Sequence, residues 1–156
     1  HDPSVVGYDD LVIRAAEAVA EGSDVVAQSM GGAVAVGLAL AHPRKIRRLV
    51  LVATSGGLDV NAFGAEDWRK EYASEFPDAA PWVTEHHVDH SQELGKISVP
   101  TCLIWGDADP ISPVAVGRTV DATLPHSILH VVAGGTHMMA GERPDEIAAL
   151  IVGHLS

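Results

Sequence analysis

Short apolar runs alternate with helical segments along most of this chain, and this alternation limits the fold more than any other feature. Strands that alternate with helices build a parallel sheet with right-handed crossovers and helices on its faces. The expected strands are residues 24–28, 48–53, 100–106 and 127–132, and the expected helices are residues 8–20, 31–41, 113–124 and 144–155. We therefore predict a three-layer α/β sandwich with a mostly parallel sheet of about four strands.

Residues 57–99 interrupt this alternation. The stretch is more polar than its surroundings, and its apolar residues show helical spacing only between about residues 66 and 76. It lacks the Gly/Ser-rich composition of a flexible linker. A chain of 156 residues can bury one sizeable core but is short for two domains. We expect a single domain over residues 1–156, with a small insertion at 57–99.

The charge of the chain argues against two classes of partner. Its formal net charge is −11 at pH 7, which would repel both nucleic acid phosphates and anionic lipid headgroups. No apolar stretch reaches the roughly 18 residues that a membrane-spanning helix needs. The lone Cys102 cannot form an internal disulfide, as is usual in a reducing compartment. We expect no nucleic acid or membrane partner, and a cytoplasmic location.

The sequence around Ser29 predicts an exposed nucleophile. A buried strand leads through Ala27-Gln28-Ser29-Met30-Gly31 into a helix rich in small residues. Such a turn strains the serine backbone, so the residues two before and two after it must be small. The Met30 N–H at the helix start could then stabilise an oxyanion. A plain alternative is a serine N-cap followed by glycines that permit close packing.

A serine hydroxyl needs a base to take its proton and a carboxylate to orient that base. Asp107 and Asp109 follow the third expected strand, and His137 follows the fourth on a glycine-rich loop. The carboxyl ends of parallel strands meet at one edge of the sheet, where α/β proteins gather their sites. Ser29, one of the two acids and His137 should therefore lie together.

The chain resembles the α/β-hydrolase superfamily, in the branch of esterases, C–C bond hydrolases, enol-lactonases and cofactor-free haloperoxidases. The resemblance rests on the elbow at residues 28–32, the acid turn at 106–113, and Gly-Thr-His at 135–137 followed by Glu-Arg-Pro at 142–144. The order nucleophile, acid, histidine is also the family's order. The resemblance covers nearly the whole chain and implies the C-terminal half of the fold, with residues 57–99 as a small cap.

The resemblance also implies roles for individual residues. Ser29 would attack an ester-like carbonyl, or an activated C–C or lactone bond, and His137 would act as the base. The triad acid would be Asp109, while Asp107 would form hydrogen bonds within its loop. Another branch of the family places the acid after the preceding strand, which would point to Asp59. No cofactor and no metal ion are expected, and the partner is a small ester-like molecule.

A group of metal-ligand residue types lies inside the insertion. His86, His87, Asp89 and His90 could bind zinc through neutral imidazoles and a carboxylate. No spacing fixes a fourth ligand, so a solvated part of the cap is the plainer interpretation. A metal-binding cap would make the protein a sensor.

Family members normally place three or four strands and a helix before the elbow, whereas here a single expected helix precedes Ser29. The absent part includes a loop that donates the second oxyanion N–H. It would also pair with the strand at 24–28, which otherwise leaves an open edge. We expect an N-terminal segment, or a partner in a homo-oligomer, to cover this edge. The alternative to an enzyme is a non-catalytic hydrolase-like fragment or binding module that needs such a partner.

Overall fold

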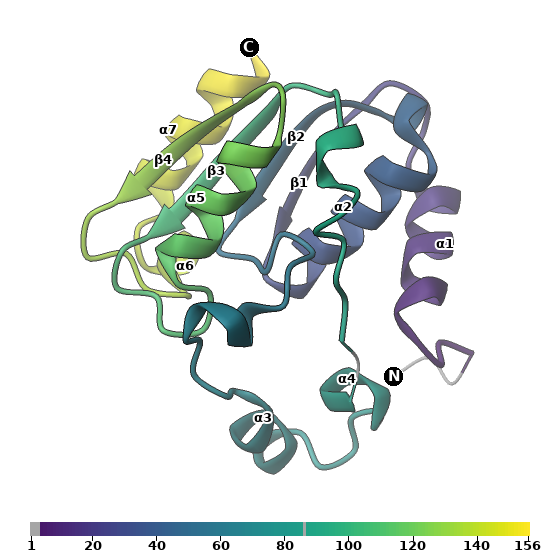
Figure 1. Ribbon diagram of the computed structural model, residues 1–156, viewed down its shortest axis with the longest axis vertical. Coiled ribbons are helices and arrows are strands. Elements are labelled where there is room, and N and C mark those ends of the chain that lie inside the picture. The colour runs from purple at the N-terminus through teal and green to yellow at the C-terminus, as the bar shows by residue number, and fades with distance from the viewer. Residues whose placement is uncertain (1–3, 86) are drawn as a thin grey trace.

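The computed structural model describes residues 4–85 and 87–156 and confirms the predicted α/β fold (Figure 1). Its four strands are β1 (Ser23–Gln28), β2 (Ile46–Val52), β3 (Thr101–Gly106) and β4 (Ser127–Val132). They form one sheet in the order β1-β2-β3-β4, and every neighbouring pair is parallel. The strand bounds agree with the predicted ones to within two residues.

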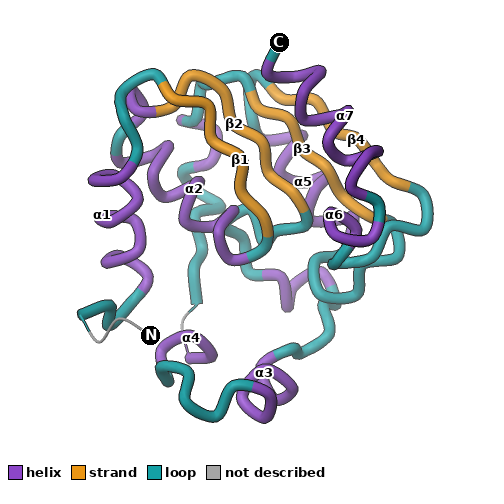
Figure 2. The backbone as a smooth tube through the Cα atoms, turned by 180° about the vertical axis from the view of Figure 1, so that it is seen from behind, coloured by secondary structure: helices purple, strands orange, loops and turns teal. Residues whose placement is uncertain are grey.

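Helices cover both faces of this sheet. The long ones are α1 (Tyr8–Ala18), α2 (Met30–Ala41), α5 (Val114–Thr123) and α7 (Pro144–Leu155), and the short α6 (Met139–Glu142) precedes α7. The predicted first helix is two residues too long, because Val19 already has extended backbone angles. Helices α2 and α5 lie on one face of the sheet, and α7 lies on the other (Figures 1 and 2). In the described part of the chain, no helix has the length and apolar character needed to cross a membrane.

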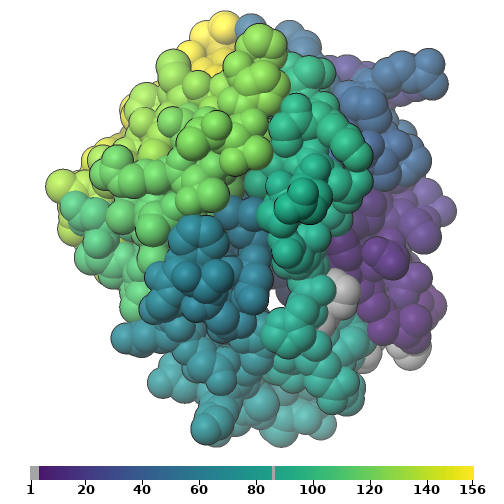
Figure 3. Space-filling view, in the orientation of Figure 1, coloured from purple at the N-terminus to yellow at the C-terminus, as the bar shows by residue number. Residues whose placement is uncertain are grey.

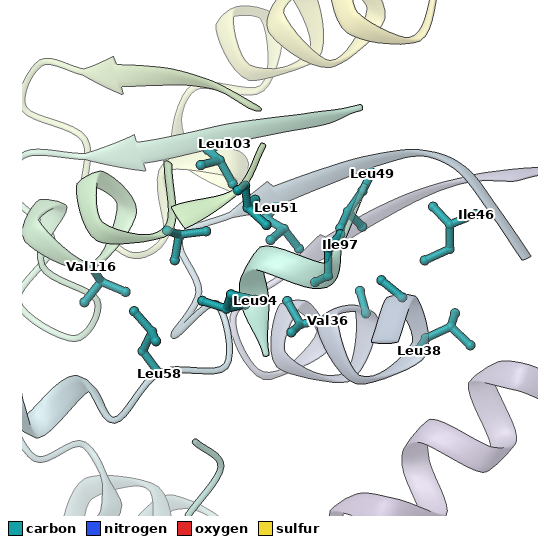
Figure 4. Packing of buried hydrophobic residues seen from close by; sticks show 14 of the residues in the cluster. Val36, Leu38, Ile46, Leu49, Leu51, Leu58, Leu94, Ile97, Leu103 and Val116 are labelled. Atoms are coloured by element: carbon teal, nitrogen blue, oxygen red, sulfur yellow. The ribbon is translucent and has the colours of Figure 1, made fainter. Parts of the chain in front are cut away.

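Strand β2 shows how the sequence divides the core between the two faces. Leu49 and Leu51 point to the face covered by α2 and α5, whereas Val50 and Val52 point to the face covered by α6 and α7. All four are at most 2% exposed. Successive side chains of a strand point to opposite faces, so a strand buried on both sides is apolar at every position. Figure 4 shows Leu49 and Leu51 packed with residues of α2 and α5.

Residues 57–99 leave the end of β2, run below the sheet and return to β3 (Figure 1). They contain η2 (Val60–Phe63), α3 (Arg69–Glu75), α4 (Trp82–Glu85) and η3 (Leu94–Lys96). The helix predicted over residues 66–76 is α3, which is shorter at both ends. The two limbs of the segment are anchored in the core by Leu58, Leu94 and Ile97.

Strand β1 is an edge strand among the described residues. Val26 of this strand is paired with Val50 and points to the face that α7 covers farther along the sheet, yet it is 47% exposed, although valine is usually buried in strands of this kind of sheet. At the opposite edge, Ile128 of β4 is 58% exposed. Ser29 therefore follows the edge strand β1, as the sequence leads us to expect for a chain with one helix before the elbow.

Candidate active site

The turn between β1 and α2 places Ser29 in a strained backbone conformation. Its φ of 51° and ψ of −126° lie outside the regions that non-glycine residues favour. The turn is held by main-chain hydrogen bonds, because the Ser29 N–H donates to the Val52 carbonyl at 3.1 Å and its own carbonyl accepts from the Gly32 N–H at 3.0 Å. The main chain on both sides of the serine therefore maintains the strain.

The glycines after the serine differ from expectation. A Cβ atom on Gly31 would meet nothing within 4 Å, although the elbow motif led us to expect that Gly31 must lack bulk. A Cβ atom on Gly32 would lie 2.4 Å from the Thr54 Oγ1 atom. The close approach thus occurs one residue later than predicted. Its partner is a residue after β2, which spacing around Ser29 does not reveal.

The structure brings Ser29, His137 and Asp109 together in a continuous chain of contacts. The Ser29 Oγ atom lies 2.9 Å from His137 Nε2, and His137 Nδ1 lies 2.9 Å from Asp109 Oδ2. The His137 side chain is 14% exposed and that of Asp109 is fully buried. With the ring proton on Nδ1, His137 donates to the carboxylate and its Nε2 atom can accept the serine proton.

The carboxylate of Asp109 is oriented from its other side as well. Its Oδ1 atom accepts hydrogen bonds from the Ile111 and Ser112 N–H groups, both at 2.9 Å. Oδ2 is therefore the atom left to face the imidazole. Hydrogen bonds of this kind fix the position of a buried carboxylate.

The two alternative acids lie elsewhere. Asp107 Oδ1 accepts from the Gly134 N–H at 2.6 Å, so this carboxylate ties the acid turn to the histidine loop and does not contact the imidazole in the hydrogen bonds described. Asp59 is exposed and its Oδ1 atom accepts from the Asn61 N–H at 3.1 Å, which caps η2. Of the three candidate acids, Asp109 is the one in contact with His137.

The loops that contain Asp109 and His137 touch through their backbones. The Ala108 N–H donates to the Gly135 carbonyl at 3.0 Å. A Cβ atom on Gly106 would lie 2.0 Å from that same carbonyl oxygen, so only glycine fits at residue 106. The separation of the acid and the histidine is thus set by main-chain contact at the ends of β3 and β4.

Sequence reasoning missed a buried polar network beneath these loops. Thr54 is fully buried and its hydroxyl donates to the Ser29 carbonyl at 2.6 Å. The Ser112 hydroxyl donates to the Thr54 carbonyl and accepts from Trp105 Nε1 at 3.0 Å. Because the Ser112 N–H also holds Asp109, the network joins the serine turn to the acid turn. The sequence signal was weak, since a hydroxyl residue after a strand has many roles.

Met30 is the first residue of α2, so its N–H has no partner within the helix. This N–H lies directly after the serine and at the positive end of the helix dipole. The oxyanion role expected for Met30 requires an N–H at this position.

A cavity of about 430 Å³ opens between the carboxyl edge of the sheet and residues 57–99. Ser29 and His137 line it on one side, and Trp68, Tyr72 and Trp82 line it on the other. Figure 3 shows the molecule hollowed between the two limbs of the 57–99 segment. A cavity of this volume with largely apolar walls is typical of a small-molecule site.

Tyr8 extends the cavity wall from α1. Burial raises the pKa of its phenol to about 12, so the hydroxyl stays neutral near pH 7. This hydroxyl donates to the Ala33 carbonyl at 2.7 Å and lies 3.1 Å from His90 Nε2. His90 in turn lies 3.5 Å from Glu93, so it joins the end of the 57–99 segment to α1 and α2.

The histidine group of the insertion does not gather around a point in the described residues. His87 is exposed, Asp89 accepts from the Ser91 N–H at 2.9 Å, and His90 points to Tyr8. His86 lies outside the residues that the structure describes. Within residues 4–85 and 87–156, no three His, Cys, Asp or Glu side chains are grouped so that they could hold a metal ion.

Comparisons with known proteins agree with this architecture. A 2-hydroxy-6-oxononadienedioate/2-hydroxy-6-oxononatrienedioate hydrolase from Pseudomonas putida is 23% identical over an alignment that covers 84% of this chain and 62% of the relative. A pimeloyl-[acyl-carrier protein] methyl ester esterase from Neisseria meningitidis is 27% identical and covers 82% of this chain and 67% of the relative. No protein-family model matches the chain.

Solved structures show the same fold. The serine hydrolase CarC, involved in carbazole degradation, superposes with a TM-score of 0.79 at 19% identity, over 99% of this chain and 74% of that one. The α/β-hydrolase MGS-MChE2, from a sediment metagenome of the Mar Chica lagoon, gives a TM-score of 0.78 at 21% identity, over 94% of this chain and 68% of that one.

The chain spans only part of its relatives. It covers about two thirds of the Pseudomonas and Neisseria proteins, and a 57-residue match at 37% identity covers 21% of the hydrolase YugF of Bacillus subtilis. The names of these proteins are those of hydrolases and of one esterase. The chain has the fold of the α/β hydrolases among these solved structures.

Proposed function

We propose that this protein is a serine hydrolase that cleaves a carboxylic ester through Ser29, His137 and Asp109. One observation supports the proposal most directly. The Ser29 hydroxyl, the His137 imidazole and the Asp109 carboxylate follow one another at 2.9 Å, beside a cavity that can hold a small molecule. This is the arrangement that turns a weak alcohol nucleophile into a reactive one.

In the first half of the reaction, the Ser29 proton moves to His137 Nε2 as the Oγ atom forms a bond to the ester carbonyl carbon. The carbonyl oxygen becomes an oxyanion, and the Met30 N–H donates to it. Collapse of this intermediate breaks the bond to the alcohol oxygen, and His137 returns the proton to the departing alkoxide. The products of this half are the free alcohol and an ester of Ser29.

In the second half, His137 takes a proton from water while the water oxygen attacks the acyl carbon. The new oxyanion again receives the Met30 N–H, and collapse releases the acid and restores the Ser29 hydroxyl. Asp109 remains ionised throughout, because its role is to hold the imidazole orientation and to stabilise its transient positive charge.

The relatives' names include a methyl ester esterase and a hydrolase of a 2-hydroxy-6-oxo-dioate. Cleavage of a carbon–carbon or lactone bond would use the same three side chains. We propose a carboxylic ester as the substrate because its alkoxide leaving group needs only the proton that His137 carries, whereas a carbon leaving group must also be stabilised as a carbanion.

Labelling with a fluorophosphonate tests the proposal, since this reagent reacts with an activated serine. We expect one adduct, located at Ser29 by mass spectrometry, and hydrolysis of 4-nitrophenyl hexanoate. Ser29→Ala should abolish both the adduct and the hydrolysis. Ser55→Ala is the matched control, because Ser55 lines the same cavity and its Oγ atom accepts only from the Gly57 N–H among the hydrogen bonds described.

Two results would contradict the proposal. One is folded protein that forms no adduct and turns over no ester, which would favour a non-catalytic binding module. The other is an adduct that persists in Ser29→Ala, which would place the reactive group elsewhere.

A further inference from the structure

The 57–99 segment holds a large share of the protein's negative charge. It contains nine carboxylate side chains and only three basic ones, in a chain whose net charge is −11. More than half of the net charge therefore belongs to little more than a quarter of the sequence. This same segment forms the wall of the cavity opposite Ser29.

Several of these acidic side chains lie at the cavity itself. Asp59, Glu71 and Glu75 are exposed and line it. Charges of one sign around a cleft raise the local concentration of ligands of the opposite sign and lower that of ligands of the same sign.

Arg69 is the basic side chain among the residues that line the described cavity, aside from histidines. Its guanidinium is already engaged by the protein. Nε donates to the Thr84 carbonyl at 3.0 Å, Nη1 lies 3.4 Å from Asp67 Oδ1, and the group lies over the Trp68 ring at 5.3 Å. Much of its capacity to bind a ligand anion is therefore used within the segment.

Most of the remaining wall is apolar, apart from Ser55, Ser112 and His87. Trp68, Tyr72 and Trp82 provide aromatic surface, and Leu58, Val83 and Ile111 provide aliphatic surface. Trp82 Nε1 donates to the Val5 carbonyl at 3.1 Å, so the one polar atom of this ring already has a partner within the protein. A charged ligand group placed against such a wall loses hydration and gains no partner.

We propose that this cavity binds an uncharged, apolar acyl chain and discriminates against acyl chains that end in a carboxylate. This proposal rests on the proposed serine hydrolase function in one respect. If the protein hydrolyses esters, the discrimination appears as a difference in the turnover of the two kinds of ester. Two or three partly hydrated unit charges at separations of several ångströms disfavour a ligand anion by about tenfold in total.

A pair of esters that differ at one end tests the selection. The pair is 4-nitrophenyl hexanoate and mono-4-nitrophenyl adipate, which share the leaving group and the acyl length and differ in a terminal methyl or carboxylate. At an ionic strength of about 10 mM, we expect kcat/KM to favour the hexanoate by about tenfold or more. The ratio should fall at about 1 M salt, where the Debye length shrinks to about 3 Å.

Variants that neutralise charges at the cavity test whether these charges cause the preference for hexanoate. The double variant Glu71→Gln/Glu75→Gln should lower the hexanoate-to-adipate ratio at least threefold. Glu17→Gln/Glu21→Gln is the matched control, because both residues are exposed, lie at or just beyond α1 and outside the cavity lining, and remove the same charge. The control should leave the ratio unchanged, since the effect depends on distance and not on net charge.

A binding measurement separates this proposal from the hydrolase proposal. In the Ser29→Ala variant, the 4-nitroanilide of hexanoic acid and the mono-4-nitroanilide of adipic acid should quench tryptophan fluorescence, because Trp68 and Trp82 line the cavity. We expect the hexanoic anilide to bind about tenfold more tightly. This result can be obtained even if neither ester is turned over and no fluorophosphonate adduct forms.

Three outcomes would overturn the proposal. The first is equal or tighter binding of the adipic anilide. The second is a preference for adipate that disappears in Arg69→Gln, which would make Arg69 a carboxylate receptor. The third is the absence of saturable quenching by either anilide, since the cavity would then bind no apolar acyl chain.

Discussion

The carboxyl edge of the sheet and the 57–99 segment face each other across one cavity, yet they are built in opposite ways. The edge is held by main-chain contacts and buried hydroxyls, and its reactive side chains are half-buried or buried. The segment has short helices with no fully buried residue in α3 or α4, and it bears many exposed charges. We propose that one side fixes the reaction geometry and that the other selects the ligand.

The largest effect on catalysis should come from Asp109, the carboxylate at the edge of the sheet. Asp109→Asn keeps an oxygen for the Ile111 and Ser112 N–H groups but turns an amide NH₂ toward His137. The imidazole must then carry its proton on Nε2, where it cannot accept from Ser29. We expect kcat to fall by about 10⁴-fold, as is typical for this change in serine hydrolase triads, with little loss of stability.

Asp107→Asn is the matched control for this substitution. Its amide oxygen can still accept from the Gly134 N–H, so kcat for 4-nitrophenyl hexanoate should stay within about threefold. A loss in Asp107→Asn as large as that in Asp109→Asn would mean that the acid is wrongly assigned.

The next effect concerns the packing of the serine turn. Gly32→Ala would place a methyl group 2.4 Å from Thr54 Oγ1, so the free energy of unfolding should fall by about 1–3 kcal/mol in urea denaturation. Gly31→Ala meets open space within the same helix, so it should instead gain about 0.5–1 kcal/mol. If both variants are equally destabilised, the close contact with Thr54 is not what requires glycine.

A smaller loss is expected from the buried network. Thr54→Val keeps the shape but leaves the Gly56 N–H without its 3.2 Å acceptor and removes the bond to the Ser29 carbonyl. The free energy of unfolding should fall by about 1–2 kcal/mol. Thr119→Val removes a comparable hydroxyl–carbonyl hydrogen bond at an exposed site. This variant should change the free energy of unfolding by less than about 0.5 kcal/mol. Equal losses would argue against a special role for burial at Thr54.

The last prediction needs no substitution and probes local opening of the segment. Lys70 is exposed near the start of the seven-residue α3, whereas Arg47 and Arg48 lie within β2. Short elements with few buried contacts open at little cost in free energy. Brief trypsin treatment should therefore cut after Arg69 or Lys70 first, as seen by fragment mass. First cleavage within β2 would show that the sheet opens more easily than the segment.

The two regions also differ in how well the sequence predicted them. Residues 127–132 and 144–155 matched β4 and α7 at every bound, because apolar runs and a proline at the first helical turn act locally. Ser29, His137 and Asp109 met at one edge because parallel strands bring their carboxyl ends together. Pattern and topology were sufficient for these features.

Thr54, Ser112 and the tight approach at Gly32 could not be predicted in this way. Each depends on which side chain lies opposite after β2 and β3 have paired, and that information is tertiary. The segment was harder still. Its helical spacing suggested a helix over residues 66–76. In the structure the helix is Arg69–Glu75, with Trp68 as its N-cap residue and Phe76, which has non-helical backbone angles, as its C-cap residue. Short helices in polar sequence leave little periodicity to detect.

The backbone contact between Gly106 and the Gly135 carbonyl has a consequence for engineering. The acid turn and the histidine loop dock through their backbones, so apart from the Asp107 contact with the Gly134 N–H their spacing depends little on surface side chains. A graft of this site onto another parallel sheet would need to transfer both loops together, along with the two strands that feed them. Conversely, the outer faces of both loops offer positions for diversification that leave the reactive geometry in place.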